Sequence, residues 1–273
     1  MSEVEAGWQP IEMPASGYEI AFEAYGVPLA VAASRPDILE RVRPYLPPGW
    51  KSCESSEIER RFEIRHDADG SYSFLKDGKP ENIGLGLELA VLMFDTEMRL
   101  YIARKAPGVI FVHAGVVAHR GKTIVLPGLS FAGKTTLVAA LVRAGARYYS
   151  DEFAVLDENG LVHPYAKRLS LRDNNQIQIE HPVESFGGTA GDEPLPVGAV
   201  AVTSYRPGGE WRPQRLSAGQ GAMAMLANTV PARERPEESL RAVWRAVDGA
   251  VVLESERGEA EALAPLLLAE LER

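Results

Sequence analysis

Residues 123–135 read TIVLPGLSFAGKT, an aliphatic run that leads into a glycine-containing segment. From Gly128 to Thr135 the sequence fits the pattern G-x-x-x-x-G-K-[ST] without a mismatch. The run before it, Thr123–Leu126, has the composition of a buried strand, and the residues after it predict an amphipathic helix over 134–144. Strand, loop and helix in this order predict a phosphate-binding loop, and the alternative is an ordinary glycine turn before a helix.

Each position of this loop has a chemical role. Gly128 and Gly133 permit the backbone dihedral angles that let successive N–H groups converge on phosphate oxygens. The start of the following helix adds its unpaired donors and its dipole. Lys134 can reach the β- and γ-phosphates as a point charge, and Thr135 can place its hydroxyl on Mg²⁺. The residues expected to bind the nucleotide are Gly128, Ser130, Ala132, Gly133, Lys134, Thr135 and Thr136.

An acidic pair, Asp151-Glu152, follows the loop after one helix and one strand. This spacing places both carboxylates at the carboxyl end of a strand close to the loop, where α/β sheets hold their ligands. Beside Mg²⁺ and a γ-phosphate, one carboxylate can orient the metal while the other accepts the proton of an attacking hydroxyl. The alternative for the pair is an exposed acidic turn.

Composition limits the classes of protein that this chain can belong to. The 273 residues are 45% apolar and 25% charged, which is typical of a globular protein and excludes a disordered or collagenous one. A net charge of −9 argues against nucleic acid and anionic membranes as partners. Cys53 is the only cysteine, so an intrachain disulfide and a cysteine-based zinc site are excluded. Without a signal-like start or a long apolar run, the sequence predicts a cytoplasmic protein.

The break Ala106-Pro107-Gly108 divides the chain into two expected sections. Residues 1–105 predict a small α+β section of hairpins and helices, and residues 106–273 predict the catalytic domain. In the first section we expect two strands over 18–34, a helix over 36–45, a hairpin over 59–78, and a helix over 85–104 with Leu85, Leu89, Leu92, Met93 and Leu100 at helical spacing.

The second section predicts alternating strands and helices. After the hairpin that leads into the loop, we expect strands over 146–156 and near 162–172, a loop over 173–196, a strand over 198–205, a helix from Ser217, a helix over 236–247, a strand over 250–254 and a helix over 259–272. In the helix over 236–247, Leu240, Val243, Trp244 and Val247 form one apolar stripe that is expected to pack on a sheet.

Three segments together resemble the catalytic domain of HPr kinase/phosphorylase and its shorter homologues: His113-Ala114-Gly115, the loop at 128–135, and Tyr149-Ser150-Asp151-Glu152. The resemblance covers about 108–172, continues more weakly to the C-terminus and does not extend over 1–105. It implies an α/β fold, namely a P-loop kinase domain of the HPr kinase/PEP carboxykinase-like type, with a small α+β section before it.

The resemblance also implies roles for the polar residues. Asp151 would be the general base for the acceptor hydroxyl, Glu152 a metal-side carboxylate together with Thr135, and His113 a neighbour that orients Asp151. For His113, a histidine with a structural role at a strand end is an equal alternative. The bifunctional enzymes usually carry two aspartates, so Glu152 departs from their pattern and weakens the case for phosphorylase activity.

The expected function is that of a kinase that uses ATP and Mg²⁺ to phosphorylate a serine hydroxyl of a peptide or small protein. The short homologues include kinases of lasso-peptide precursors, so a peptide natural-product precursor is one candidate acceptor. The alternatives are a nucleotide-binding regulatory or peptide-binding protein with weak ATPase activity, and a kinase of a small metabolite such as free serine. Because the bifunctional relatives are hexamers, the resemblance favours a homo-oligomer.

Two further segments invite a functional interpretation. Residues 216–220, LSAGQ, resemble the signature loop of ABC-type ATPases, but no strand ending in Asp-Glu follows, and Ser217 with Gln220 predicts a helix-capping box instead. Residues 185–196 are rich in glycine and proline and form either a segment that orders over the substrate or a surface loop.

Each of two basic stretches has a functional interpretation and a structural one. The first offers cations for a transferring phosphoryl group or an acidic peptide, and the second could reach the nucleotide with one strand face; both are also explained by solvated surface charge. In the second stretch, strand alternation would place Arg168 and Arg172 on one face and Lys167 on the other. The residues concerned are Arg206, Arg212 and Arg215 in the first stretch, and Lys167, Arg168 and Arg172 in the second.

Overall fold

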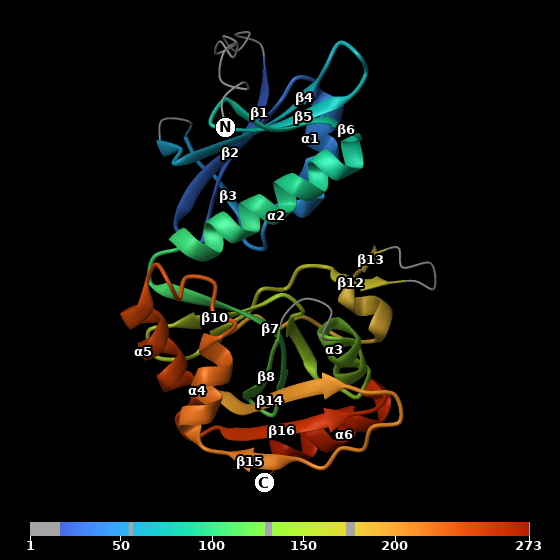
Figure 1. The fold of residues 1–273 in the computed structure, drawn as a ribbon, viewed down its shortest axis with the longest axis vertical. Helices are drawn as coiled ribbons and strands as arrows, with labels where there is room; N and C mark the ends of the chain where they lie inside the picture. Colours follow the sequence, from blue (N-terminus) through green and yellow to red (C-terminus); the bar gives the residue numbers. More distant parts are fainter. Residues whose placement is uncertain (1–16, 55–56, 129–132, 173–177, 273) are drawn as a thin grey trace, which may run out of the picture. The chain divides into compact units, whose positions relative to one another are not determined.

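The computed structural model describes residues 17–54, 57–128, 133–172 and 178–272 (Figure 1). The chain divides into two compact units, residues 1–107 and residues 108–273, two residues beyond the expected boundary at 105. Each unit has its own sheet and its own helices, six helices in all among the described residues. The mixed α/β class expected from the sequence is therefore confirmed.

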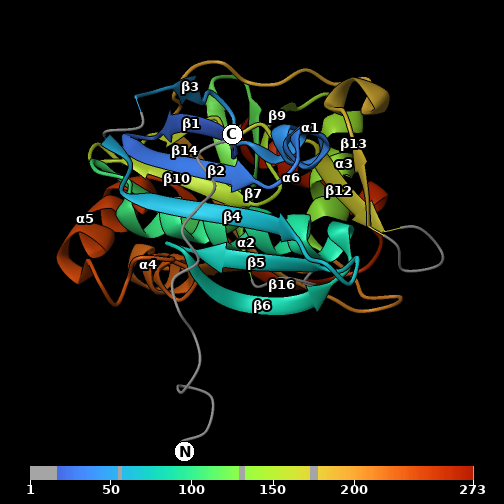
Figure 2. The same ribbon diagram turned by 90° about the horizontal axis from the view of Figure 1, so that it is seen from above.

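The first unit is built on a six-stranded sheet. Its strands lie in the order β3-β1-β2-β4-β5-β6, and Figure 2 shows β1, β2, β4, β5 and β6 side by side. The turn expected at Tyr25-Gly26 joins β1 to β2, with both residues at positive φ. The bounds are Tyr18–Ala24 for β1, Val27–Ala33 for β2, Lys51–Ser52 for β3, Arg60–His66 for β4, Tyr72–Lys76 for β5 and Lys79–Leu85 for β6.

Two helices, α1 (Pro36–Val42) and α2 (Leu87–Lys105), complete this unit. The apolar face of α2 differs from the expected stripe, because Leu89 and Leu92 are exposed. The buried face instead centres on Phe94, whose ring meets Phe62 of β4 edge to face at 5.7 Å. Helical spacing alone did not distinguish these two faces, since both carry apolar residues; packing against β4 and β5 decides between them.

The second unit contains an eight-stranded mixed sheet in the order β11-β10-β7-β8-β14-β16-β15, with β9 paired to β7, and a separate pair, β12-β13. β8, β14 and β16 run parallel to one another, whereas β7 is antiparallel to its neighbours. The bounds are Val109–His119 for β7, Lys122–Pro127 for β8, Arg147–Ser150 for β9, Phe153–Asp157 for β10, Val162–His163 for β11, Leu169–Arg172 for β12, Gln178–His181 for β13, Val197–Tyr205 for β14, Gln214–Leu216 for β15 and Val251–Arg257 for β16.

Helices cover both faces of this sheet. α3 and α6 pack on one face, α4 and α5 on the other (Figure 1). Side chains alternate accordingly along β8, where Ile124 and Leu126 join the cluster under α3 and Val125 joins the cluster under α5. The bounds are Lys134–Arg143 for α3, Ala218–Leu226 for α4, Pro236–Val247 for α5 and Ala260–Glu270 for α6. None of the described helices is long and apolar enough to cross a membrane.

The stripe expected on α5 is only half buried. Val243 and Val247 lie in the core, but Leu240 is 49% exposed and Trp244 is 50% exposed. The small residues Ala242 and Ala246, together with Ser239, complete the buried face. The helix is rotated from the expected orientation because small side chains let it approach the sheet closely.

The loop expected over 173–196 contains regular structure. It includes β13 and a 3₁₀ turn at Val183–Phe186, while residues 173–177 lie outside the described part of the chain. Farther on, the segment runs beside β9, because Tyr148 N–H donates to Thr189 O at 2.9 Å and Gly191 N–H donates to Tyr148 O at 2.7 Å. Of the two interpretations of 185–196, backbone pairing with β9 supports a packed surface segment.

Candidate functional site

The acidic pair lies in a break between two strands. β9 ends at Ser150 and β10 begins at Phe153, and both are antiparallel to β7. The Ser150 hydroxyl accepts hydrogen bonds from the N–H groups of Glu152 and Phe153, at 3.0 and 2.8 Å. The single strand expected over 146–156 is therefore interrupted at Asp151-Glu152, and this turn directs the carboxylates out of the regular alternation.

The phosphate loop begins on the other side of β7. Gly128 N–H donates to His113 O at 3.2 Å where β8 ends, so the loop starts beside the histidine. The described chain resumes at Gly133, which has a φ of 72° and caps α3. Two expected ligands, Ser130 and Ala132, lie outside the described residues. The start of the loop thus lies against β7, the strand that pairs on its other edge with β9 and β10 around the acidic pair.

Asp151 is buried and surrounded by donors. Its Oδ2 accepts hydrogen bonds from Thr135 Oγ1 and from Ser170 N–H, both at 3.2 Å. Its Oδ1 accepts a hydrogen bond from the Tyr148 hydroxyl at 3.0 Å and lies 3.6 Å from Lys167 Nζ. The contact with Thr135 joins the phosphate loop directly to the acidic pair.

Glu152 is the more accessible of the two carboxylates. Its side chain is 22% exposed, against 2% for Asp151. Its Oε1 lies 3.7 Å from His113 Nε2 and its Oε2 lies 3.9 Å from Lys167 Nζ. His113, which was expected to orient Asp151, thus has a measured contact with Glu152.

Lys134 points back over its own loop, with Nζ donating to Gly128 O at 2.8 Å. Burial lowers the pKa of Lys134, and the nearby carboxylates of Glu152 and Asp151 oppose that shift. Two residues further on, Thr136 has an exposed side chain on α3. The ammonium group therefore lies within the electrostatic field of the acidic pair.

Tyr148 belongs to the site but was not assigned to it from the sequence. Lys167, for which nucleotide contact and surface charge were both open, lies beside the acidic pair. Burial raises the pKa of Tyr148 well above its usual range, and the negative charge of Asp151 raises it further, so the hydroxyl stays protonated and donates. Lys167 precedes β12 and turns toward both carboxylates, while Arg168 is exposed. The side chain of Arg172 lies outside the described part of the chain. The strand expected near 162–172 is interrupted, because residues 164–168 lie in no strand between β11 and β12, so strand alternation does not apply to Lys167 and Arg168.

The donor set suits Mg²⁺. Within the described residues, no three His, Cys, Asp or Glu side chains cluster as a dedicated metal site. Mg²⁺ does not require such a cluster, because it commonly binds one or two protein oxygens together with waters and substrate phosphates. The Thr135 hydroxyl and the Asp151 carboxylate, already in contact, supply oxygens of that kind.

The basic stretch over 206–215 does not belong to this site in the structure. Its arginines are exposed and pair with nearby carboxylates, as expected for solvated surface charge. The pairs are Arg206 with Glu256, Arg212 with Glu210 and Arg215 with Glu270.

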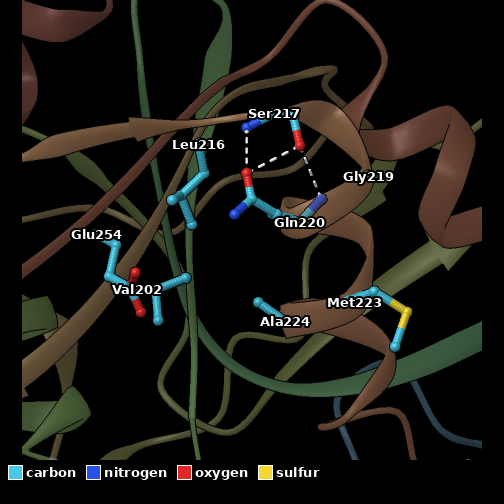
Figure 3. A pocket seen from close by; sticks show the side chains of 8 residues that line it. All are labelled: Val202, Leu216, Ser217, Gly219, Gln220, Met223, Ala224 and Glu254. Carbon is cyan, nitrogen blue, oxygen red and sulfur yellow. Dashed lines mark hydrogen bonds between the residues drawn. The ribbon is translucent and has the colours of Figure 1, made fainter.

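A hollow of about 460 Å³ opens beside α4 (Figure 3). Ser217 and Gln220 lie at its edge and form both hydrogen bonds of a capping box, which confirms the structural interpretation of LSAGQ. Val202 and Met223 are among its other lining residues. Because α4 packs on the face of the sheet opposite α3, this hollow is separate from the phosphate loop.

No model of a protein family matches the chain, and a search of curated proteins finds no match.

Proposed function

We propose that the chain is an ATP- and Mg²⁺-dependent kinase that phosphorylates a hydroxyl group, with the serine of a peptide or small protein as the acceptor. The observation that carries this proposal is the hydrogen bond between Thr135 of the phosphate-loop helix and Asp151 of the acidic pair. It supports the P-loop kinase interpretation of the HPr kinase/PEP carboxykinase-like type, in which the loop and the carboxylates act on one phosphoryl group. The proposal also includes a cytoplasmic location, a homo-oligomeric state and a peptide as the acceptor.

The reaction transfers one phosphoryl group. The acceptor oxygen forms a bond to the γ-phosphorus, the bond from that phosphorus to the β,γ-bridging oxygen breaks, and ADP leaves. The proton of the acceptor hydroxyl passes to a carboxylate of the acidic pair. Lys134 and the N–H groups at the start of α3 compensate the phosphate charge. Bound Mg²⁺ would neutralise developing charge on the phosphate oxygens, with Thr135 and a carboxylate holding it.

The two carboxylates divide the work according to their surroundings. The resemblance assigns Asp151 as the base and Glu152 as the metal-side group. The contacts favour the opposite division, because both oxygens of Asp151 accept hydrogen bonds and one of them touches Thr135. Glu152 is more exposed and lies beside His113, which suits a group that must meet an incoming hydroxyl. We therefore place Asp151 on the metal side and Glu152 as the base.

Phosphate transfer from ATP to serine-containing peptides, to HPr and to free serine tests the proposal, with product detected by mass spectrometry. Lys134→Ala should abolish ATP binding, and Glu152→Gln should lower kcat by about 100-fold or more at nearly unchanged ATP affinity. Asp151→Asn should raise the Mg²⁺ concentration required for activity. Glu237→Gln, which alters an exposed carboxylate on α5, serves as the control.

Each outcome of this assay has a defined meaning. If Glu152→Gln transfers phosphate as fast as the wild type while Asp151→Asn does not, the base is Asp151. If Lys134→Ala binds ATP normally, the phosphate loop is wrongly assigned. The acceptor that becomes phosphorylated separates a peptide kinase from a kinase of small metabolites.

A nucleotide-binding regulatory or peptide-binding protein with weak ATPase activity is the second candidate. It is favoured by the full engagement of Asp151, whose oxygens both accept hydrogen bonds already. ATP binding without transfer to any tested hydroxyl would support this candidate over the kinase.

A further inference from the structure

The end of β16 brings a buried cation to the phosphate loop. Arg257, the last residue of the strand, is only 2% exposed. Its Nη2 donates to Gly133 O at 3.0 Å, and its Nη1 donates to Gly258 O at 3.0 Å. A residue far from the loop in the sequence therefore contacts the glycine that opens α3.

This guanidinium has no carboxylate partner in an ion pair among the described residues, and Glu259 and Glu261 act on it only at longer range. Its Nε also lacks a hydrogen-bond partner there. Removing a charge from water costs free energy unless it is compensated. A buried arginine without an ion-pair partner among the described residues, beside a predicted polyanion site, needs an explanation beyond packing.

An aromatic ring holds the guanidinium in place. Cζ of Arg257 lies 5.3 Å from the centre of the Tyr205 ring, within the range of a cation–π contact. The Tyr205 hydroxyl in turn donates to Glu259 Oε1 at 3.0 Å. The backbone is fixed as well, because Arg206 N–H donates to Arg257 O at 2.9 Å. The cation is thus supported from the side away from the loop.

Gly133 is shaped to receive this cation. Its φ of 72° is one that residues with a side chain rarely adopt, and a Cβ atom there would lie 2.6 Å from Nη2 of Arg257. Its carbonyl accepts a second hydrogen bond, from Leu137 N–H at 3.2 Å, which is the first helical bond of α3. Arg257 therefore fixes the residue through which the loop turns into the helix.

We infer that Arg257 is a positioning residue that holds Gly133 and the first turn of α3 in the geometry that receives phosphate groups. The Gly133 carbonyl group is anchored, so the N–H groups at the start of α3 stay directed at the anion. Preorganisation of this kind raises affinity because less ordering remains for the ligand to impose. The inference rests on the proposed nucleotide site.

The first test measures affinity for Mg-ADP and for pyrophosphate by calorimetry. Arg257→Met should weaken both by roughly ten- to hundredfold, the range expected for loss of a charged hydrogen bond. Arg257→Lys should recover part of the loss, because it keeps one donor for Gly133. Arg206→Met removes an arginine that is 67% exposed and should change affinity less than about twofold. At saturating ATP, kcat of Arg257→Met should change far less than KM.

The second test needs no ligand. Amide hydrogen exchange at Leu137 should be faster in Arg257→Met than in wild type or Arg206→Met, because its acceptor carbonyl is no longer anchored. Unchanged exchange would overturn the inference, as would unchanged affinity in a protein that binds nucleotide. If the wild-type protein binds no nucleotide, the proposed function is wrong. Faster exchange at Leu137 in Arg257→Met would then still support the positioning role of Arg257.

A pair of substitutions covers the case in which Arg257→Met fails to fold. Tyr205→Phe keeps the ring beneath the guanidinium and should behave as wild type in the exchange measurement. Tyr205→Leu removes the ring and should speed exchange at Leu137. Equal exchange in these two variants would contradict the support assigned to the ring.

Discussion

Asp151 shows how one buried carboxylate is held in a fixed orientation. A carboxylate removed from water is costly unless donors replace its hydration. Here a tyrosine hydroxyl, a threonine hydroxyl and a backbone N–H supply three hydrogen bonds, and the ammonium group of Lys167 lies 3.6 Å away. Such a group is well fixed in position, which suits metal orientation better than repeated proton transfer.

Removal of the Tyr148 hydroxyl tests how this group holds Asp151. Tyr148→Phe removes a buried donor to a charged oxygen, so we expect the free energy of unfolding to fall by about 1.5–3 kcal/mol and the Mg²⁺ requirement for nucleotide binding to rise. Tyr149→Phe is the control, because that hydroxyl donates at 2.7 Å to the neutral carbonyl of Glu193. Tyr149→Phe should lower the free energy of unfolding by only about 0.5–1.5 kcal/mol and leave the Mg²⁺ requirement unchanged. Urea denaturation and Mg²⁺ titration measure both, and equal effects would contradict the role of Tyr148.

At the scale of elements, α3 depends on close contact with β7. Gly115 lies in β7 opposite the helix, and a Cβ atom there would come 2.7 Å from Val138 Cγ2. Interiors are packed too tightly to absorb an extra methyl group without movement. The glycine in the His113-Ala114-Gly115 segment therefore sets how near the phosphate-loop helix lies to the sheet.

Gly115→Ala should lower the free energy of unfolding by about 1–3 kcal/mol through overpacking. The companion change Val138→Ala removes the opposing methyl groups. The double variant should therefore lose less free energy of unfolding than the two single variants lose together. Denaturation of the four proteins of this cycle measures the coupling. Strictly additive losses would show that α3 is not held by this contact.

Local signals allowed much of this fold to be predicted. The turn at Tyr25-Gly26, the start of α3 at Lys134 and the capping box at Ser217 each depend on residues close in sequence, and each is confirmed. The three-residue edge strand β15 and the break at Asp151-Glu152 went unpredicted. Both depend on a partner strand far along the chain, β16 for the first and β7 for the second.

The candidate site divides in the same way. The loop and the acidic pair are contiguous motifs and were found from spacing, although nucleotide binding itself stays a prediction. Arg257 was not found, because its relation to the site exists only after strands from distant segments come together. Lys167 was named from the sequence, but the choice between a role in the site and surface charge stayed open until folding placed it beside the acidic pair. A buried arginine at the end of an alternating strand gives no local sign that its side chain turns toward a loop.

At the scale of the whole molecule, the chain carries two units with separate cores. Phe94 is fully buried in the first unit, whereas Leu263 lies in the cluster under α3 and α6 in the second. The two described clusters of the second unit contain no residue before Ile110. The two units should therefore respond independently to substitutions in their interiors.

Phe94→Ala and Leu263→Ala should each lower stability by about 3 kcal/mol. In the double variant we expect the two losses to add within about 0.5 kcal/mol. Hydrogen exchange followed by mass spectrometry assigns each loss to peptides of its own unit. Faster exchange of first-unit peptides in Leu263→Ala would show that the cores are coupled.

The order of strands has a consequence for synthesis of the chain. β8, which leads into the phosphate loop, pairs on one side with β7 just before it and on the other with β14, where Thr123 faces Val197. Arg257 emerges from the ribosome later still, at the end of β16. A nascent chain therefore exposes its loop motif well before the strands that flank and anchor it exist, and long-range parallel pairing of this kind is slow. The proposed nucleotide site should mature only after translation has passed β16, so an incomplete chain carries the motif without the site.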